Sequence, residues 1–469
     1  MKNLYDLYCM DIYVKDVKTN SKNVSLGDVF VCINGVNKDR HLYIEEAVSN
    51  GASFLIVSRG NDYPISFVKV NDTNKELVKV CSYVYSNFKN INIIAVTGTD
   101  GKTTVASILR DLLGINNCGY IGTNGIKGKF LNVSSENTTP ALEIIYKTLD
   151  NFFDEGLKYC SMEVSSEGIL RNRVDGLLFD VGILTNFTSD HLNVHGNIKN
   201  YLKCKRKVFN KIKKDGVAIL NRDDYYFSYF RKSCKCNVIT YGISKYSKLR
   251  ILDYSLASNG SIITYLYCGK KYVINSPLVG VFNIYNLSAA ICVLLYYGYS
   301  FSMIRKMIFN INIPLGRCEF LNYDTSYDIF LDYAHTGNGV FNVLTFLNSI
   351  KKKRIITVIG SAGGREKEKR KYIGEYAQKL SDLVIYTTDD PRYEDVSSII
   401  DDLIYKDMNN YVIEENRKRA IYKALDIAES GDIVAILGKG RDNYMAIKDK
   451  KILYSDVLVL DDYFSKRQC

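Results

Sequence analysis

The feature that most constrains this chain is a glycine-rich loop between a strand and a helix. The run INIIAV is short and rich in β-branched residues, which is typical of a buried parallel strand, and it continues directly into TGTDGKTT. A helical stretch, Val105 to Leu113, follows the loop. In this arrangement glycines let backbone N–H groups approach phosphate oxygens at the start of a helix. The sequence therefore predicts a phosphate site made of Gly98, Thr99, Gly101, Lys102, Thr103 and Thr104.

Two side chains of this loop suit a bound nucleotide. Lys102 would meet the β- and γ-phosphates, and Thr103 would ligate Mg²⁺. The spacing is GxxGKT, shorter than the general GxxxxGK[ST] loop, so the generic pattern is not satisfied. An ordinary glycine-rich turn is the alternative, but the flanking strand and helix favour a phosphate site. Nucleotide binding alone does not define a reaction.

Strands and helices are expected to alternate along most of the chain. Strands at residues 159–164 and 181–185 each follow a helical stretch, which is the order of a parallel sheet with helices on both faces. A third α/β unit begins after Arg317, with strands expected at residues 329–331, 354–359, 383–387 and 433–437.

The length also indicates several domains, because single cores stop growing beyond roughly 250 to 300 residues. The chain has 469 residues, and a small α/β unit ends near Asn90. We therefore predict an α/β protein of three domains: residues 1–90, residues 91–317 with a mostly parallel sheet, and residues 318–469 with a Rossmann-like arrangement.

Composition argues against several classes of protein. The start of the chain mixes acidic and basic residues, unlike a signal peptide, and the most apolar run is shorter than the roughly 20 residues that span a bilayer. The twelve cysteines are scattered and form no CxxC, which favours reduced thiols in a cytoplasmic protein. The net charge of +11 comes from 62 basic residues interleaved with 51 acidic ones, so we expect anionic small substrates and no nucleic acid.

A possible metal site follows from the few histidines. Only four are present, and two of them, His191 and His195, lie in TNFTSDHLNVHG after a predicted strand end. Glu163, in SMEVSS, ends another predicted strand and offers the hard oxygen ligand that Mg²⁺ prefers. Ligands gather at the carboxyl ends of strands in such sheets. A structural histidine is the alternative, and the neighbouring Asp190 favours a functional one.

A series of motifs makes the chain resemble a known family. TGTDGKTT, MEVSS, TNFTSDHLNVHG, YLKCKRKVF, GVFNIYN, LGRCE, DYAHT, TTDDPRYED and GKG occur in the order and spacing seen in the Mur ligases. The resemblance covers essentially the whole chain and is greatest to the members that add the third residue of the peptidoglycan stem peptide, the UDP-N-acetylmuramoyl-tripeptide synthetases.

The resemblance implies an ATP-dependent amide ligase. In that family ATP phosphorylates the D-glutamyl carboxylate of UDP-N-acetylmuramoyl-L-alanyl-D-glutamate, and the amine of a diamino acid attacks the acyl phosphate. Two Mg²⁺ ions offset the charge of the phosphates. The partners would be this UDP-linked dipeptide and a free diamino acid, diaminopimelate or lysine, and the enzyme would be a monomer.

Site residues are implied position by position. Lys205 matches the family's carbamylated lysine, formed with CO₂, although a solvated basic helix face would be the default interpretation without the surrounding motifs. The metal ligands would be Thr103, Glu163, His191 and carbamylated Lys205. Asn283 and Asn286 match positions near adenine, while the third domain would close on ATP through Arg317, Asp332 and the catalytic His335.

The remaining matches concern the two other substrates. The first domain would hold the uridine end through Ser21, and the muramoyl dipeptide would be held by Asn137, Thr138, Thr139, Ser165 and Arg173. Arg392 in DDPR matches the arginine of the family's DNPR motif, which goes with diaminopimelate, whose distal carboxylate a guanidinium can bind bidentately. The amino-acid pocket would be completed by Arg365, Asp389, Asp390, Gly438 and Asp442.

Departures from the family pattern fall mainly in the substrate pockets. The family's SSH, DSR, DGH, DYAHTP and GKGHE read SSE, NSK, DRH, DYAHTG and GKGRD here, and the asparagine of DNPR is Asp390. A carboxylate at this position would repel a substrate carboxylate and could bind a second amine, which leaves lysine or ornithine open. A divergent paralogue with another acceptor or amine also stays open.

Two further alternatives belong to other classes of protein. A folylpolyglutamate-type ligase is the nearest enzyme rival, but it needs no uridine-binding domain, whereas this chain has a full-length first domain. A non-catalytic nucleotide-binding scaffold would be expected to have lost Lys102, Glu163, His191 or Lys205, and all four are present.

Overall fold

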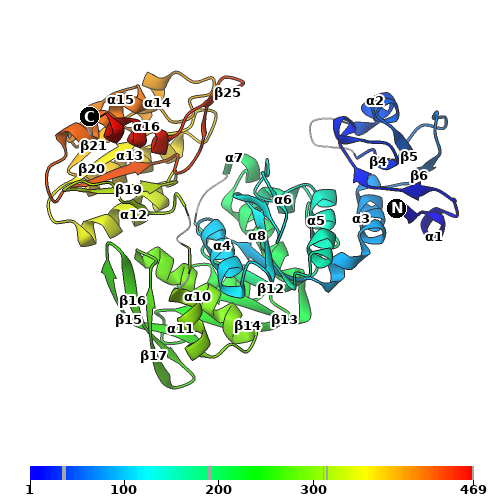
Figure 1. Cartoon of the computed structure of the whole chain (residues 1–469), viewed down its shortest axis with the longest axis horizontal. Coiled ribbons are helices and arrows are strands. Elements are labelled where there is room, and N and C mark those ends of the chain that lie inside the picture. The colour runs from blue at the N-terminus through cyan, green and yellow to red at the C-terminus, as the bar shows by residue number, and fades with distance from the viewer. Residues whose placement is uncertain (34–38, 189–191, 310, 313–314, 467–469) are drawn as a thin grey trace. The chain divides into compact units, whose positions relative to one another are not determined.

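The computed structural model describes residues 1–33, 39–188, 192–309, 311–312 and 315–466. Within them the chain divides into two units (Figure 1). The first unit consists of residues 1–95, 113–181 and 211–216, and the second of residues 96–112, 182–210 and 217–469. The chain thus passes between the units several times.

A four-stranded parallel sheet in the order β3-β4-β5-β6 forms the N-terminal part of the first unit. All side chains of β4 and most of those of β5 are buried. Helix α3 begins after Asp72, whose carboxylate accepts hydrogen bonds from the backbone of Asn74 and Lys75. The elements are β1 (Lys2–Asn3), α1 (Tyr5–Tyr8), β2 (Tyr13–Val14), β3 (Val17–Lys18), η1 (Ser21–Asn23), β4 (Asp28–Val31), η2 (Arg40–Tyr43), α2 (Ile44–Ser49), β5 (Ala52–Val57), β6 (Phe67–Lys69), α3 (Thr73–Val84) and η3 (Ser86–Asn90).

The rest of the first unit is built around a second set of strands. Strands β8 and β11 pair in parallel, while β8, β9 and β10 follow one another as antiparallel neighbours. Strand β11 is almost wholly buried and ends at Glu163, which places this carboxylate at a strand's carboxyl end. The elements are β7 (Asn92–Thr97), which continues into the second unit, β8 (Cys118–Gly122), β9 (Gly125–Lys127), β10 (Asn132–Val133), α5 (Leu142–Asp154), β11 (Tyr159–Glu163) and α6 (Ser166–Leu170).

The second unit opens with the phosphate-loop segment and an extended β region. Strands β13, β14 and β15 pair in parallel, and β15, β16 and β17 form antiparallel hairpins. The elements are α4 (Lys102–Leu113), β12 (Phe179–Leu184), α7 (Leu192–His195), α8 (Ile198–Asn210), β13 (Ile212–Asn221), α9 (Phe227–Arg231), β14 (Asn237–Gly242), β15 (Leu249–Ala257), β16 (Gly260–Tyr267), β17 (Lys270–Ser276), α10 (Val281–Tyr296) and α11 (Phe301–Phe309).

The C-terminal part has a six-stranded sheet in the order β18-β19-β23-β20-β21-β22, parallel except for β18. Apolar side chains of α12, α13 and α14 form a core on one face, and those of α15 and α16 form a core on the other (Figure 1). The elements are β18 (Glu319–Leu321), β19 (Asp328–Asp332), α12 (Gly337–Ile350), β20 (Ile355–Ile359), α13 (Glu368–Leu380), β21 (Leu383–Tyr386), α14 (Val396–Leu403), β22 (Tyr411–Ile413), α15 (Arg417–Ile427), β23 (Ile433–Leu437), β24 (Tyr444–Ile447), β25 (Lys450–Leu453) and α16 (Asp456–Ser465).

The predicted α/β class is confirmed, including the strands from which it was inferred. The strand expected at residues 354–359 is β20, and that expected at 433–437 is β23. The domain limits at residues 90 and 317 stay predictions. Across the part of the chain that the structure describes, every helix is too short or too polar to cross a membrane.

Candidate functional site

The phosphate loop lies between the end of β7 and the start of α4, as predicted. Gly98 and Gly101 have φ angles of 152° and 82°, in the region that favours glycine. A Cβ at Gly98 would lie 1.8 Å from Thr185 Oγ1, and one at Gly101 would lie 2.4 Å from Asn286 Oδ1. Both glycines are therefore required by close packing as well as by backbone conformation.

Residues that follow β12 hold this loop in place. The backbone N–H of Thr99 donates to the carbonyl of Asn186 (2.9 Å), and that of Asp100 donates to Asn186 Oδ1 (2.9 Å). Thr185 Oγ1 donates to the Asp100 carbonyl (2.6 Å). Lys102 Nζ lies at the loop itself, donating to the carbonyls of Gly98 (3.1 Å) and Thr99 (2.7 Å). These hydrogen bonds therefore fix the conformation of the loop, and the Lys102 ammonium lies beside it.

Lys205, predicted as a metal-site residue, lies beside this loop. It belongs to α8, is only 1% exposed, and its Nζ donates to the Gly98 carbonyl (2.6 Å). The same nitrogen lies 4.7 Å from the ring centroid of Tyr201. The default interpretation of a solvated basic helix face is wrong for this lysine, because its side chain is buried. His191 lies outside the described residues.

The two asparagines predicted near adenine also lie next to the loop. Asn286 packs against Gly101, and its Nδ2 donates to Asn283 Oδ1 (3.1 Å). Asn283 Nδ2 in turn donates to the carbonyl of Val279 (2.9 Å). Both side chains are buried on α10, so their orientation is fixed.

Asp332 ends β19, and burial raises the pKa of its carboxyl to about 6. Its two oxygens accept the backbone N–H groups of Cys318 (2.5 Å) and Ala334 (2.6 Å). Arg317 lies over the ring of Tyr333, 4.8 Å from its centroid. His335 is exposed, and its Nδ1 lies 2.7 Å from the Tyr333 carbonyl. Arg317, which precedes β18, therefore lies close to the residues at the end of β19.

In the first unit, Glu163 is fully buried and well supported. Its Oε1 accepts hydrogen bonds from Tyr120 Oη (2.6 Å) and the Thr123 backbone (2.9 Å). Thr139 Oγ1 donates to the Glu163 carbonyl (2.9 Å) and accepts the backbone N–H of Ser165 (2.9 Å). Three of the predicted residues, from two segments of the chain, therefore meet at the end of β11.

The other residues predicted for the UDP-linked substrate lie in the same unit. Arg173 Nη1 donates to the Thr139 carbonyl (2.7 Å), and burial lowers the pKa of its guanidinium. Arg173 lines a cavity of about 1030 Å³ with Thr19 and Arg40 among its other walls. Thr138 Oγ1 lies 3.1 Å from Thr123 Oγ1, whereas Asn137 is exposed and Ser21 is buried.

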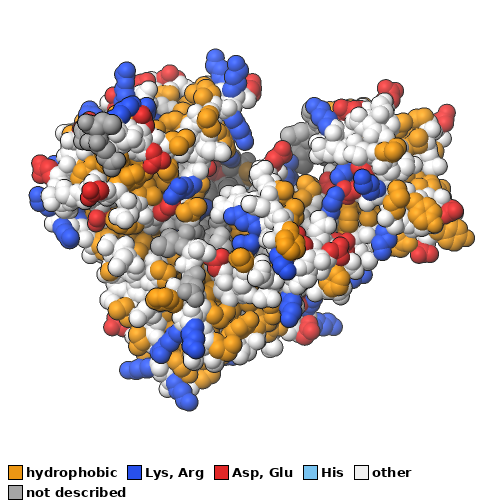
Figure 2. All heavy atoms as spheres, viewed as in Figure 1, with side chains coloured by type: hydrophobic (Ala, Val, Ile, Leu, Met, Phe, Trp, Pro, Cys, Tyr) orange, Lys and Arg blue, Asp and Glu red, His pale blue; other side chains and the backbone are white. Residues whose placement is uncertain are grey.

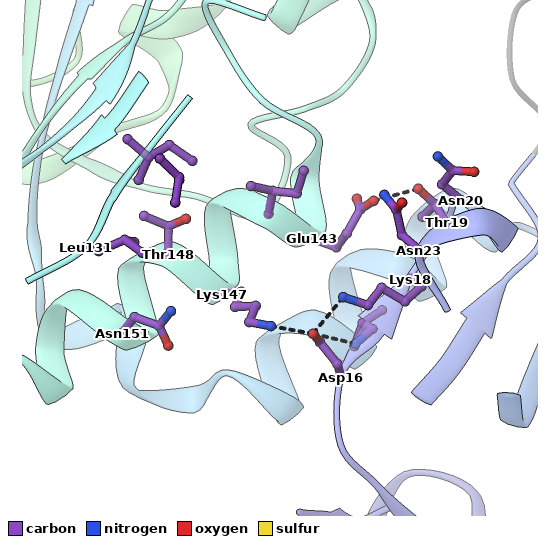
Figure 3. Close-up of a pocket in the computed structure, with 14 residues that line it drawn as sticks. Asp16, Lys18, Thr19, Asn20, Asn23, Leu131, Glu143, Lys147, Thr148 and Asn151 are labelled. Atoms are coloured by element: carbon purple, nitrogen blue, oxygen red, sulfur yellow. Dashed lines mark hydrogen bonds and ion pairs between the residues drawn. The ribbon is translucent and has the colours of Figure 1, made fainter. Parts of the chain in front are cut away.

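A contact that sequence reasoning missed joins two residues that line both this cavity and a smaller one of about 340 Å³, which Figure 3 shows. Thr19 Oγ1 donates to Glu143 (2.6 Å), whose carboxyl is buried and has a raised pKa for that reason. Figure 3 shows Lys18 and Lys147 converging on the carboxylate of Asp16. These residues stand in no recognised motif, so no sequence signal singled them out.

The predicted amino-acid pocket is centred on a lysine that was not predicted. Lys439 Nζ lies 2.9 Å from Asp390 Oδ1, 3.7 Å from Asp389 Oδ1 and 3.8 Å from Asp442 Oδ2. Burial raises the pKa of Asp389, and it raises that of Asp442 to about 6. Asp389, Asp390, Lys439 and Asp442 are called the acid–lysine cluster below. Lys439 stands in the GKG motif, which could have singled it out.

The arginines of this pocket lie at its edge. Arg392 has a φ of 51°, and its backbone N–H donates to the Ala446 carbonyl (3.0 Å). Gly438 packs against Asp389, since a Cβ there would lie 2.6 Å from Asp389 Oδ2. Arg365 is exposed and lines a cavity of about 1090 Å³ that Thr99 also lines. Along the chain, the predicted residues of this pocket follow the carboxyl ends of β20, β21 and β23.

Charged side chains of both signs lie on the surface. On the side that Figure 2 shows, Lys and Arg side chains lie interspersed with Asp and Glu. Ion pairs between such side chains include Lys418 with Asp462 (2.6 Å). Charge on this side is therefore mixed over short distances.

Comparisons with known proteins point in one direction. The family model described as the Mur ligase middle domain matches residues 96–294, and the one described as the Mur ligase, glutamate ligase domain matches residues 316–440. A protein of Clostridium tetani named UDP-N-acetylmuramoyl-L-alanyl-D-glutamate–2,6-diaminopimelate ligase is 34% identical over 468 residues, covering 97% of this chain and 95% of that protein. A protein of Aquifex aeolicus with the same name is 35% identical and has the same coverage.

Solved structures agree with this. One titled as a UDP-N-acetylmuramoyl-L-alanyl-D-glutamate–2,6-diaminopimelate ligase has a TM-score of 0.71 and 25% identity, and the match covers 100% of this chain and 99% of that one. A folylpolyglutamate synthase of Mycobacterium tuberculosis has a TM-score of 0.64 at 17% identity, and it covers only 77% of this chain. The similarity to the second structure concerns the fold alone.

Proposed function

The chain belongs to the Mur ligase family, and we propose that it is the ATP-dependent ligase that joins a diamino acid to UDP-N-acetylmuramoyl-L-alanyl-D-glutamate in peptidoglycan synthesis. The observation that carries the proposal is that similarity to ligases of this name extends over 97% of the chain, including the first unit. Three groups of contacts also support it: those of Lys102 at the phosphate loop, those of Arg173 with Thr139 and those of the acid–lysine cluster.

The first half of the reaction would take place at the phosphate loop. The D-glutamyl carboxylate attacks the γ-phosphorus of ATP, ADP leaves, and an acyl phosphate forms. Lys102 and the loop N–H groups would stabilise the transferring phosphoryl group, because fixed donors aimed at developing charge need no reorganisation. Arg317 would add a second cation, while Asn283 and Asn286 would border the adenine.

The second half is attack of the amine on the acyl carbon. Phosphate leaves with the electron pair of the broken C–O bond, and the amine gives up a proton. His335 and the segment around Asp332 would border the reacting groups, and closure over them would exclude water from the acyl phosphate.

The residues present fit the implied metal ions and carbamate. The Thr103 hydroxyl and the Glu163 carboxylate are the hard oxygen donors that Mg²⁺ prefers, and both side chains are buried. Lys205 has its amine nitrogen at the loop, where CO₂ would convert it into an anionic oxygen ligand. His191 would complete the set. As the family resemblance implies, two Mg²⁺ ions held by such ligands would offset the negative charge of the phosphates.

We propose that the first unit binds the UDP-linked dipeptide. Arg173, Thr139 and Ser165 form one hydrogen-bonded group, and Arg173 lines the cavity of about 1030 Å³. Asn137 and Thr138 lie on the same segment. Ser21 would contact the uridine end, as the family resemblance implies.

Diaminopimelate is favoured as the incoming amino acid. Its far end carries both an ammonium and a carboxylate, and the pocket offers Arg392 for the carboxylate and Asp442 for the ammonium. Asp390 is paired with Lys439, which offsets part of the negative charge of the cluster, so Asp390 repels a substrate carboxylate less than the sequence suggests. Lysine would leave Arg392 without an anionic partner.

The remaining proposals follow from the family. We place three domains at residues 1–90, 91–317 and 318–469, which would hold the UDP precursor, ATP and the amino acid. The protein would act in the cytoplasm as a monomer.

The test supplies ATP, Mg²⁺ and the UDP-linked dipeptide, with diaminopimelate, lysine or ornithine added separately. Phosphate release and product mass are followed together. We expect release that depends on diaminopimelate, with the matching mass gain. Phosphate release only with lysine or ornithine would identify that amino acid, in place of diaminopimelate, as the substrate. No product with any of the three would overturn the proposal, and a parallel reaction with a folate and glutamate would then identify the rival ligase.

A further inference from the structure

Asp100 places a carboxylate inside the phosphate loop, between Thr99 and Gly101. This is an unfavourable location for a carboxylate, since the proposed function places the phosphates of ATP at this loop. A carboxylate turned toward the phosphates would repel them. The orientation of this one side chain therefore matters for any triphosphate that the loop binds.

Asn338 supplies the contact that holds this carboxylate. Asn338 Nδ2 donates to Asp100 Oδ2 at 2.9 Å, and it is the only hydrogen bond that the described part of the chain shows for this carboxylate. The two residues are 238 positions apart in the sequence. The Asp100 backbone is separately fixed by Thr185 and Asn186, so the contact with Asn338 acts on the side chain alone.

The surroundings of Asn338 require a neutral donor. It is the second residue of α12, whose N-cap Thr336 accepts the backbone N–H of Gly339 (3.0 Å). Nearby, Asp332 already has a raised pKa, caused first by burial and also by the charge of Asp100. A second carboxylate at position 338 would face Asp100 directly, and neither could donate a hydrogen bond when ionised.

We propose that Asn338 is a positioning residue for the ATP-dependent step. Its amide draws the Asp100 carboxylate toward α12 and away from the phosphates, and the same bond joins α12 to the phosphate loop. The inference rests on the proposed function. It adds a residue that stands outside the motifs and acts through Asp100 rather than on the substrate.

A charge-exchange experiment tests this. Asn338→Asp places two carboxylates in contact, and we expect the KM for ATP to rise at least tenfold while the melting temperature stays near that of the wild type. The double variant Asp100→Asn with Asn338→Asp restores one amide and one carboxylate with the donor reversed. We expect it to recover to within threefold of the wild type.

The matched control is Asn342→Asp, the same change one turn later on α12, at a half-buried position. We expect less than a twofold change there. An Asn338→Asp variant that behaves like this control, or a double variant as impaired as the single one, would overturn the inference. If the wild type itself makes no product, the proposed function fails instead. In that case the wild type, the two single variants and the double variant are compared by calorimetric titration with ADP. Equal affinities for ADP in all four proteins would overturn the inference.

Discussion

The phosphate loop and the acid–lysine cluster hold their polar groups in opposite ways. The loop is braced mainly by neutral groups of a single neighbouring segment, since Thr185 donates a hydrogen bond to it and Asn186 accepts one from it, and its cation donates to the loop's own carbonyls. In the cluster, three carboxylates from two loops converge on one ammonium, Lys439. The loop therefore depends on local geometry, whereas the cluster depends on long-range charge pairing.

The cluster has a second buried pair beneath it. Arg417 and Asp456 have side chains that are 0% exposed, and they lie 2.7 Å apart. Arg417 also donates to the carbonyls of Thr388 (3.4 Å) and Leu437 (3.0 Å), the residues immediately before Asp389 and Gly438. One guanidinium thus holds both loops of the cluster. The comparison predicts different consequences of substitution in the two regions. Removing a side chain of the phosphate loop should lower activity, whereas removing the buried pair that supports the cluster should lower stability.

The largest expected effect is that of a substitution in the phosphate loop, which should change activity and not stability. Lys102→Ala removes the cation at the loop mouth, and we expect phosphate release to fall by roughly 10³-fold, because one preorganised electrostatic group is commonly worth about 10²–10³ in rate. The free energy of unfolding should change little. Lys270→Ala, at an exposed lysine of β17, is the control for activity. A large loss of stability with Lys102→Ala would break the comparison.

The next effect tests the cluster's side. Asp456→Asn leaves the buried guanidinium of Arg417 without its counter-ion, and we expect the free energy of unfolding in urea to fall by about 3–5 kcal/mol. Asp462→Asn, on the same helix but exposed, should give a much smaller change because water screens its partners Lys418 and Lys466. Equal losses in the two variants would contradict a special role for the buried pair.

The same contrast explains what the sequence could predict. The phosphate loop was predictable because its residues are contiguous and its glycines fix the conformation locally. The roles of Asn338 and Arg417 were not, because they depend on which strand ends lie side by side. Asp390 is the clearest case. From the sequence its charge suggested repulsion of a substrate carboxylate, but it is paired with Lys439, 49 positions away, which offsets part of that charge.

The same distinction between local and long-range determinants applies to the fold. Strands such as β20 and β23 were predictable from short apolar runs, since every side chain in them is buried. The Thr19–Glu143 contact joins residues 124 positions apart and involves a buried carboxyl that no periodic pattern indicates. Position-by-position roles within the site stay predictions until variants are measured.

A third test uses pH, and its effect should be smaller. Burial raises the pKa of Asp332 from 3.8 to about 6, so the folded state binds this proton more tightly than the unfolded state does. The associated stability is fully present below pH 3.8 and is lost as pH rises through about 6. Relative to Asp332→Asn, the wild type should lose about 2 kcal/mol between roughly pH 4.5 and 7.5. Urea unfolding at several pH values measures this, and a pH-independent difference would contradict the assigned shift.

The smallest expected effect is at Arg392, at the edge of the cluster. This substitution tests whether the edge recognises the charge of a substrate as well as stabilising the fold. Arg392→Lys keeps the positive charge but loses the planar pair of donors that binds a carboxylate bidentately. We expect kcat/KM for diaminopimelate to fall about tenfold and that for lysine to change less than about threefold, since lysine has no distal carboxylate. Lysine is thus the internal control in the same variant. Equal losses with both amino acids would mean that Arg392 supports the loop through its backbone contacts with Ala446 and Lys448, and the cluster would then be structural up to its edge.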